Sequence, residues 1–285
     1  MTRRLLGVSA LVAVASLAAC GDNAPSKKEF LAKADPVCKA STAEATALGT
    51  PTDVGGLRQF HIKLADGADR TLAGLDKVKL PGGDDGKAAK AWVQALRDAA
   101  AAARAVPPEV DKSNYTGIET TAGRAAEAFK AADSQARTFG SAECGRGEAE
   151  AVERMRTALP KTVKTAYITA ADAICKSAFT KFEALPEAET PAEFKTFMEQ
   201  AVALEEKLLA DLKAIAPPVT DKDKLDPVFL GIEKVIAKDK EALAALAAGN
   251  ERKAYDLVEE SDNLSDDSAA KADAYGFVDC GSQSS

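Results

Sequence analysis

The 285-residue sequence contains a single histidine and a single tryptophan, and aromatic residues make up only 5% of it. With His61 alone, the chain cannot build a di-iron bundle site, which needs two Glu-x-x-His motifs. A haem ligand pair would need His61 with Met155 or Met198, because the third methionine is Met1. We therefore expect no cofactor, and we interpret His61 as a residue that fills a position on its helix.

Motifs for other chemistry are also missing. There is no G-x-S-x-G nucleophile motif, no glycine-rich phosphate loop and no short C-x-x-C or C-x-x-H pair for zinc. The acidic stretches at 221–226 and 261–268 lack the spacing of a calcium loop. We interpret the first as the start of a helix and the second as a solvated helix face. The sequence thus predicts a protein without metal and without enzymatic activity, with scattered carboxylates as the enzymatic alternative.

Positive charge is in the minority, since the formal net charge is −7. An acidic surface argues against nucleic acid as a partner and against a polybasic grip on anionic lipid. No stretch after the first twenty residues is apolar enough to span a bilayer. The chain should therefore be globular beyond that point.

The first twenty residues have the features of an export signal. Arg3 and Arg4 precede an apolar run from Leu5 to Ala19, which is shorter than the roughly 20 residues of a membrane-spanning helix. The run ends in Leu-Ala-Ala-Cys, with Cys20 last, and this ending resembles the lipobox of bacterial lipoproteins. An ordinary secretory signal with a chance cysteine is the alternative.

The lipobox resemblance implies cleavage before Cys20 and lipid on that residue. Residues 1–19 would then be a lipoprotein signal peptide and residues 20–26 a tether. The protein would be lipid-anchored on the outer face of the cell membrane, which would be its first partner.

Four further cysteines, Cys38, Cys144, Cys175 and Cys280, form an even set, which in an exported chain indicates disulfides rather than zinc. Cys175 follows Cys38 by 137 residues, and Cys280 follows Cys144 by 136. Each half of the chain would therefore own two cysteines. We predict the pairs Cys38–Cys144 and Cys175–Cys280, because a duplicated unit should close on itself.

The duplication rests on more than the cysteines. A shift of 137 residues aligns the segment 30–48 with 167–185, and FGSAECG at 139–145 matches YGFVDCG at 275–281. Large apolar residues also fall on one another between these segments, as Phe60 does on Phe197. We interpret the chain as a tandem repeat.

Apolar residues in the second copy recur at steps of three and four, which predicts amphipathic helices. Breaks at 185–191, 216–221 and 248–251 separate four helices, of which the last ends at Gly276. The predicted fold is all-α, with two tandem four-helix up-down bundles, each closed by one disulfide. The predicted segments are repeat 1 (27–145), a linker (146–161), repeat 2 (162–281) and a tail (282–285).

Two prolines and the size of the core residues add detail. Pro36 should bend or restart the first helix, and the linker should be a helix that ends before Pro160 or else a flexible spacer. Gly67 and Thr71 in the first copy stand where the second has Leu204 and Leu208. The first bundle should therefore be the more loosely packed and the less stable.

A helix with AICK, a Pro-Pro turn and a closing YGFxxCG resemble small, mostly uncharacterised exported proteins of actinobacteria. This resemblance implies an Ala-rich helical lipoprotein and carries no active-site residues. We expect a non-enzymatic binding or scaffold module of the cell envelope whose partner is an envelope protein or a small ligand. The alternative is a carrier of a small apolar molecule or lipid, with its cavity in the first repeat.

Overall fold

The computed structural model describes residues 24–281, and all regular structure in that range is helical. The expected leader, Cys20 and the tail 282–285 lie outside the described residues. In chain order the elements are α1 (Lys27–Thr46), α2 (Val54–Leu75), α3 (Gly83–Arg104), α4 (Val106–Asp111), α5 (Tyr115–Thr138), α6 (Arg146–Glu183), α7 (Pro191–Ala214), the 3-10 turn η1 (Val219–Asp221), α8 (Lys222–Ala247) and α9 (Glu251–Tyr275).

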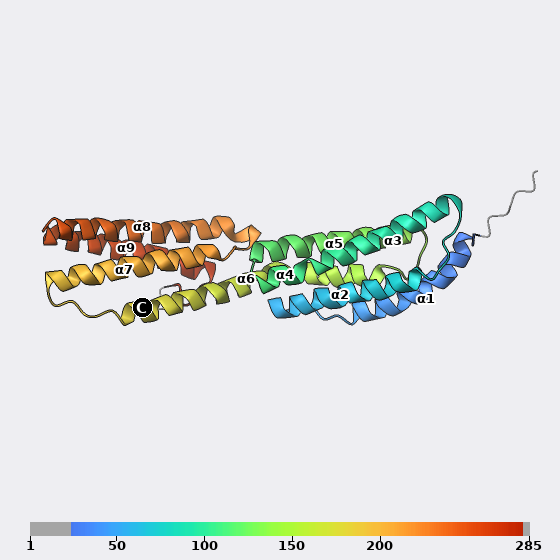
Figure 1. Ribbon diagram of the computed structural model, residues 1–285, viewed down its shortest axis with the longest axis horizontal. Coiled ribbons are helices and arrows are strands. Elements are labelled where there is room, and N and C mark those ends of the chain that lie inside the picture. The colour runs from blue at the N-terminus through green and yellow to red at the C-terminus, as the bar shows by residue number, and fades with distance from the viewer. Residues whose placement is uncertain (1–23, 282–285) are drawn as a thin grey trace, which may run out of the picture.

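The helices form an elongated molecule of two halves, and α6 runs from one half into the other (Figure 1). We call α1 to α5, together with α6 up to residue 161, the first half. The remainder of α6, with α7, α8 and α9, is the second half. Disulfides join Cys38 to Cys144 in the first half and Cys175 to Cys280 in the second, which are the two pairs expected from the spacing.

Local signals in the sequence set most of the helix ends. Ser26 and Glu29 form a capping box at the start of α1, and Thr190 and Glu193 form another at the start of α7. Gly276 adopts a left-handed conformation, with φ of 112°, and ends α9 as predicted. The acidic stretch 221–226 begins α8, and 261–268 lies within α9, also as predicted.

The predicted linker helix does not end before Pro160. Instead, α6 continues from Arg146 to Glu183 with Pro160 inside it. A proline in a helix removes one backbone hydrogen bond, at a cost of about 3 kcal/mol. The neighbouring side chains Leu159 and Val163 are buried, and we attribute the continuity of α6 to this burial on both sides of the proline.

Pro36 likewise lies within a continuous α1 rather than restarting it. The first half also has more helices than predicted, because the short α4 follows α3 directly. Pro107 and Pro108 cannot donate amide hydrogen bonds to the carbonyls of residues 103 and 104, so α3 ends there and α4 begins with a change of direction.

The predicted linker is part of the core of the first half. α6 packs against both α5 and α1, so that α1, α2, α3, α5 and α6 form a closed ring. Ala151, Val152 and Met155 are buried in this ring. The first half is therefore a bundle of five long helices rather than four.

The expectation of a loosely packed first half was wrong. Buried alanines such as Ala100, Ala125 and Ala132 allow its helices to approach closely, and Trp92 with Phe30 and Phe139 fills one end. In the second half α6 packs against α7, α7 against α8 and α8 against α9, but α6 and α9 pack little against each other. The second half is thus the more open one.

Candidate ligand-binding cavity

The second half contains a cavity of about 460 Å³ between α6, α7, α8 and α9. This volume lies within the range of small-molecule sites, about 300–1,000 Å³. The disulfide Cys175–Cys280 and Phe277 form part of its wall. Its remaining apolar lining is Phe179, Phe182, Leu208, Leu212, Val228, Phe229, Ile232, Val235 and Ala269.

The packing of the helices explains why the cavity is open. Gly231 brings α8 close to α9, since a methyl group on it would lie only 2.7 Å from Cβ of Ser268. Nothing comparable draws α9 towards α6, and no described helix fills the space between them. In the first half, α6 fills the equivalent space between α5 and α1.

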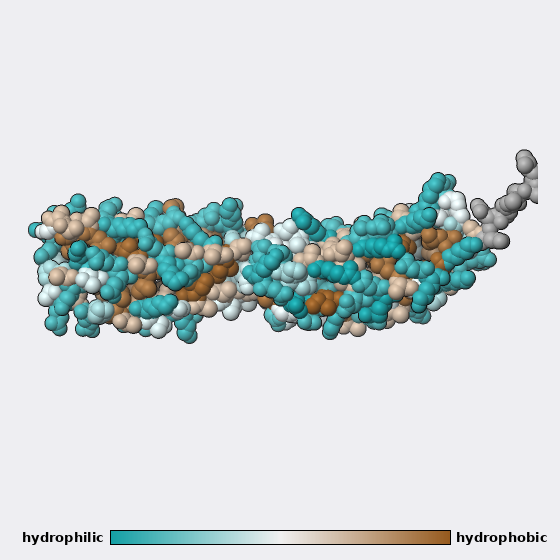
Figure 2. All heavy atoms as spheres, in the orientation of Figure 1, coloured by the Kyte–Doolittle hydropathy of each residue, from teal (hydrophilic) through white to brown (hydrophobic). Residues whose placement is uncertain are grey.

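Large apolar side chains are consequently left half-buried around the cavity. Phe179, Phe182, Phe229 and Ile232 are packed against the main core from one side only. Beyond them, a separate small core around Met198 closes the far end of the half. Figure 2 shows apolar residues reaching the surface between the helices of this half. An apolar molecule in the cavity would cover surface that now faces water.

One acidic side chain lies at the polar part of the cavity wall, with a second one behind it. Glu205 on α7 lines the cavity, and a side-chain hydrogen bond links it to Asp239 on α8, which is only 6% exposed. Burial and the neighbouring Asp239 raise the pKa of Glu205 to about 8. Burial also raises the pKa of Asp239, while a hydrogen bond from Ser261 acts in the opposite direction. Glu205 therefore keeps its proton at neutral pH when the cavity is empty.

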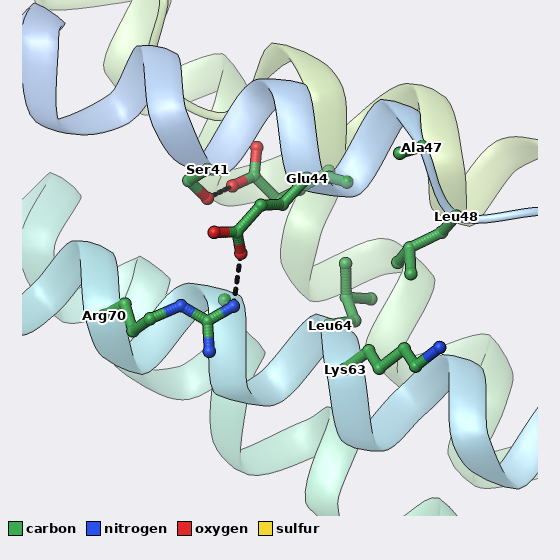
Figure 3. A pocket seen from close by; sticks show the side chains of 10 residues that line it. Ser41, Glu44, Ala47, Leu48, Lys63, Leu64 and Arg70 are labelled. Atoms are coloured by element: carbon green, nitrogen blue, oxygen red, sulfur yellow. Dashed lines mark hydrogen bonds and ion pairs between the residues drawn. The ribbon is translucent and has the colours of Figure 1, made fainter.

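A second cavity, of about 320 Å³, lies in the first half between α1, α2 and α6. Figure 3 shows Glu44 on α1 paired with Arg70 on α2 across it, with Ser41 alongside. Glu148 of α6 is 3% exposed and accepts a hydrogen bond from Ser41, and its burial raises its pKa. The ionic pair and Lys63 place charges of both signs on its wall, whereas the described charged residues that line the cavity of the second half are both acidic.

The sequence predicted a carrier cavity in the first repeat. The first half does contain a cavity, and the second half contains another that is lined by larger apolar side chains. Small residues in the first half draw the helices together, whereas the larger Leu208 and Phe229 hold those of the second half apart. Sequence reasoning also missed Glu205, Asp239 and Glu148. Glu205 did leave a signal, since it stands four residues after Ala201 and three before Leu208, on the edge of an apolar stripe.

The disulfides close the two halves in related ways. Their Cα–Cα distances are 4.8 Å for Cys38–Cys144 and 5.2 Å for Cys175–Cys280. An aspartate stands three residues before the first cysteine of each pair. Asp172 accepts hydrogen bonds from the backbone amides of three residues of the closing segment: Val278, Asp279 and Cys280.

In the first half a serine stands between the aspartate and the closing segment. Ser141 donates its hydroxyl to Asp35 at 2.6 Å, and the amide of Cys144 donates to the same hydroxyl at 3.0 Å. This contact explains the serine at the position where the second copy has Phe277. In both halves, hydrogen bonds thus hold the turn that contains the second cysteine against the helix that contains the first cysteine.

The remaining predicted residue, His61, is fully buried on α2, as expected of a residue that fills a helix position. Neither of its ring nitrogens has a hydrogen-bond partner among the described residues, and burial lowers its pKa to about 4. Within residues 24–281, no three His, Cys, Asp or Glu side chains are grouped as they would be around a metal ion. None of the described helices combines the length and apolar character needed to cross a bilayer.

The second half thus contains a cavity with largely apolar walls and an acidic pair at one side. No protein-family model matches the chain, and comparisons with curated proteins and with solved structures found no match either.

Proposed function

We propose that the protein is an exported, non-enzymatic binding module that holds a small molecule with an apolar body in the cavity of its second half. The single observation that carries this proposal is the cavity of about 460 Å³ lined by half-buried aromatic and aliphatic side chains. Burying such side chains against a ligand contributes roughly 25 cal/mol for each Å² removed from water.

The proposal includes the lipid anchor and the duplication. Signal cleavage before Cys20 would attach the module to the outer face of the membrane through lipid on that residue. Duplication is supported by the two disulfide loops, whose cysteines are 106 and 105 residues apart. It is also supported by aligned positions in pockets of both halves: Gly67 and Arg70 line the cavity of the first half, and Leu204 and Lys207 line a separate pocket between α6 and α7.

Lipidation is tested by mass spectrometry of the N-terminal peptide from the native host. We expect a peptide that begins at Cys20 and carries diacylglycerol, and a Cys20→Ser variant should be released from the membrane. An unmodified N-terminus elsewhere in the chain would overturn the anchor but not the cavity.

Ligand binding is tested with the oxidised chain from Gly21 to Ser285 and N-phenylnaphthylamine, a neutral probe that fluoresces in apolar surroundings. Binding should be saturable and reversed by n-decanol. Ala269→Trp should abolish it, because Ala269 lines the cavity, whereas the exposed neighbour Ala270→Trp should not. Binding that is absent, or equal in both variants, contradicts the proposal.

A further inference from the structure

The charged residues that line the cavity of the second half all have one sign. Among residues 24–281 they are Glu205 and Asp266, and no lysine or arginine of that range lines it. Asp266 is exposed at the rim, whereas Glu205 lies inside, with its Oε2 atom enclosed. No amide, hydroxyl or cationic group among the described residues donates to this oxygen. An enclosed carboxyl oxygen without a donor is costly to maintain, which points to a donor supplied by a ligand.

The surroundings of Glu205 do not supply a compensating cation. On α7 its neighbour Glu206 forms an ion pair with Lys240, so that this lysine is engaged on the outside of the helix. On α8, Lys238 pairs with Glu241 and Glu260 instead of with Asp239.

The helices packed around the acidic pair add negative charge or none. Asp239 faces Glu205 from α8, and Asp262 on α9 lies close enough to Asp239 for its own pKa to be raised, chiefly by burial and then by that carboxylate. From α6 the cavity wall receives only Cys175, Phe179 and Phe182, none of which is charged. The carboxyl groups of α7, α8 and α9 near the polar part of the cavity are therefore not offset by a cation from the described residues of its wall.

This inference rests on the proposed function. We propose that the ligand is a cationic amphiphile, whose ammonium group binds Glu205, next to Asp239, and whose apolar body occupies the space lined by Phe179, Phe229 and Ile232. An ammonium group has donors for the enclosed oxygen and a charge opposite to that of the pair. The apolar walls match a hydrocarbon body.

Binding of a cation would change the protonation of the pair. In the empty cavity Glu205 holds a proton, because its ionised form would lie buried beside Asp239. When the ammonium enters, Glu205 ionises and its proton passes to solvent, so the complex gains one positive charge from the ligand and loses one as H⁺. The affinity for an amine should accordingly rise with pH up to about 8, while the amine remains protonated.

The first half lacks the acidic pair. In the alignment of the two copies, Ala68 stands opposite Glu205 and Ala102 stands opposite Asp239. Both alanines allow close helix packing, and no carboxyl group is buried at their place. The two acids are thus a feature of the half that contains the apolar cavity.

Isothermal titration calorimetry with n-decylamine and n-decanol tests the inference on the oxidised chain from Gly21 to Ser285. Titrations at pH 7 in phosphate and in Tris, whose ionisation enthalpies differ, report proton release. We expect decylamine to bind about 10- to 100-fold more tightly than decanol and to release close to one proton. Glu205→Gln should abolish both effects, so that the amine and the alcohol bind this variant with similar affinity. Glu206→Gln, next to it but exposed, should behave like the parent chain.

The outcomes separate the two proposals. Equal affinity for the amine and the alcohol, or tighter amine binding that Glu205→Gln does not alter, overturns the acidic pair as the recognition group while the apolar cavity stands. A failure of both compounds to bind overturns the proposed function and this inference with it. A thermal unfolding curve of Glu205→Gln by circular dichroism that resembles that of the parent shows in addition that this variant is folded.

Discussion

Two enclosed polar side chains, His61 and Glu205, respond to pH in opposite directions. His61 in the first half is enclosed without a hydrogen-bond partner among the described residues, so the folded state disfavours its charged form. Glu205 in the second half is a buried acid, so the folded state favours its protonated form. Lowering the pH therefore destabilises the folded state through His61 and stabilises it through Glu205.

A His61→Met variant isolates the first of these effects, and Met198 occupies the aligned position in the second copy. The pKa of His61 is about 4 in the folded state, below the ordinary value of 6.5. Between pH 4 and pH 6.5 the unfolded chain therefore binds a proton at His61 that the folded chain does not bind. Stability of the parent should fall as the pH drops from 6.5 to 4, by about 3 kcal/mol from this residue.

Urea unfolding of the parent and of His61→Met between pH 4 and pH 7 measures this difference. Glu205 and the other carboxyl groups are common to both proteins, so they cancel in the comparison. A stability difference that does not vary with pH would show that His61 is not the group responsible.

Asp172 is the second residue whose contribution is separable. Its carboxylate accepts the amides of Val278, Asp279 and Cys280 at 3.1–3.2 Å. Asp172→Asn removes the charge and directs an amide donor towards these donors, which should destabilise the chain by about 1–3 kcal/mol. Reduction of Cys175–Cys280 by dithiothreitol should also become faster, because the closing segment is less firmly held. The exposed Asp226→Asn is the control, and equal reduction rates in both variants would contradict this role.

At the scale of the helix, the distance between helix backbones determines where the second half is tightly packed and where its cavity lies. α8 and α9 meet at Gly231 and Ser268, whose hydroxyl also donates to the carbonyl of Val228 at 3.2 Å. α6 and α9 have no such contact and are joined by the closing segment and its disulfide instead. The cavity lies on the side where the helices stay apart.

Gly231→Ala tests whether α8 and α9 depend on this approach. Its methyl group would lie 2.6 Å from Oγ and 2.7 Å from Cβ of Ser268, so the helices must separate, and we expect a loss of about 1–3 kcal/mol. Gly123→Ala on α5 is the matched control, because its methyl group would meet nothing within 4 Å. That variant should gain up to about 1 kcal/mol from helix propensity. Thermal unfolding of both variants measures the contrast, and a stabilised Gly231→Ala would contradict it.

Patterns along the sequence predict the positions of helices better than they predict which helices pack against one another. The apolar stripes, the breaks and Gly276 located the helices of the second half, and cysteine spacing indicated both disulfides. The role of 146–161 was missed, because a stripe reports which face is buried and not which helix covers it. The cavity of the second half was missed for a similar reason, since residue size does not reveal how closely two backbones approach.

At the scale of the whole molecule, α6 makes one body of two halves. At about 1.5 Å per residue, its 38 residues extend for about 57 Å. Where it crosses between the halves, Tyr167 lies fully buried among rings from both: Tyr115 of α5 at 5.7 Å, Tyr275 of α9 at 6.2 Å and Phe277 at 6.1 Å between centroids. The main core is continuous through this cluster.

Hydrogen bonds reinforce the same junction. The hydroxyl of Tyr115 donates to the carbonyl of Ala166 at 3.1 Å, and the amide of Val219 donates to Glu119 at 2.6 Å. Thr116 also donates to the carbonyl of Pro217. The start of α5 is thus fixed to the turn before α8, and the two halves should unfold together in one transition.

Tyr167→Ala should break that cooperativity. Removing a buried aromatic ring leaves a cavity and costs about 3–5 kcal/mol, here at the one cluster that contacts both halves. Differential scanning calorimetry should show one transition for the parent, with equal calorimetric and van't Hoff enthalpies, and two for the variant.

Tyr167→Phe should keep one transition at an equal or higher temperature, because the hydroxyl it loses is buried without a partner among the described residues. Tyr255→Ala, at an exposed ring far along the second half, should also keep one. Two transitions already in the parent chain would mean that α6 connects the halves without coupling their stability.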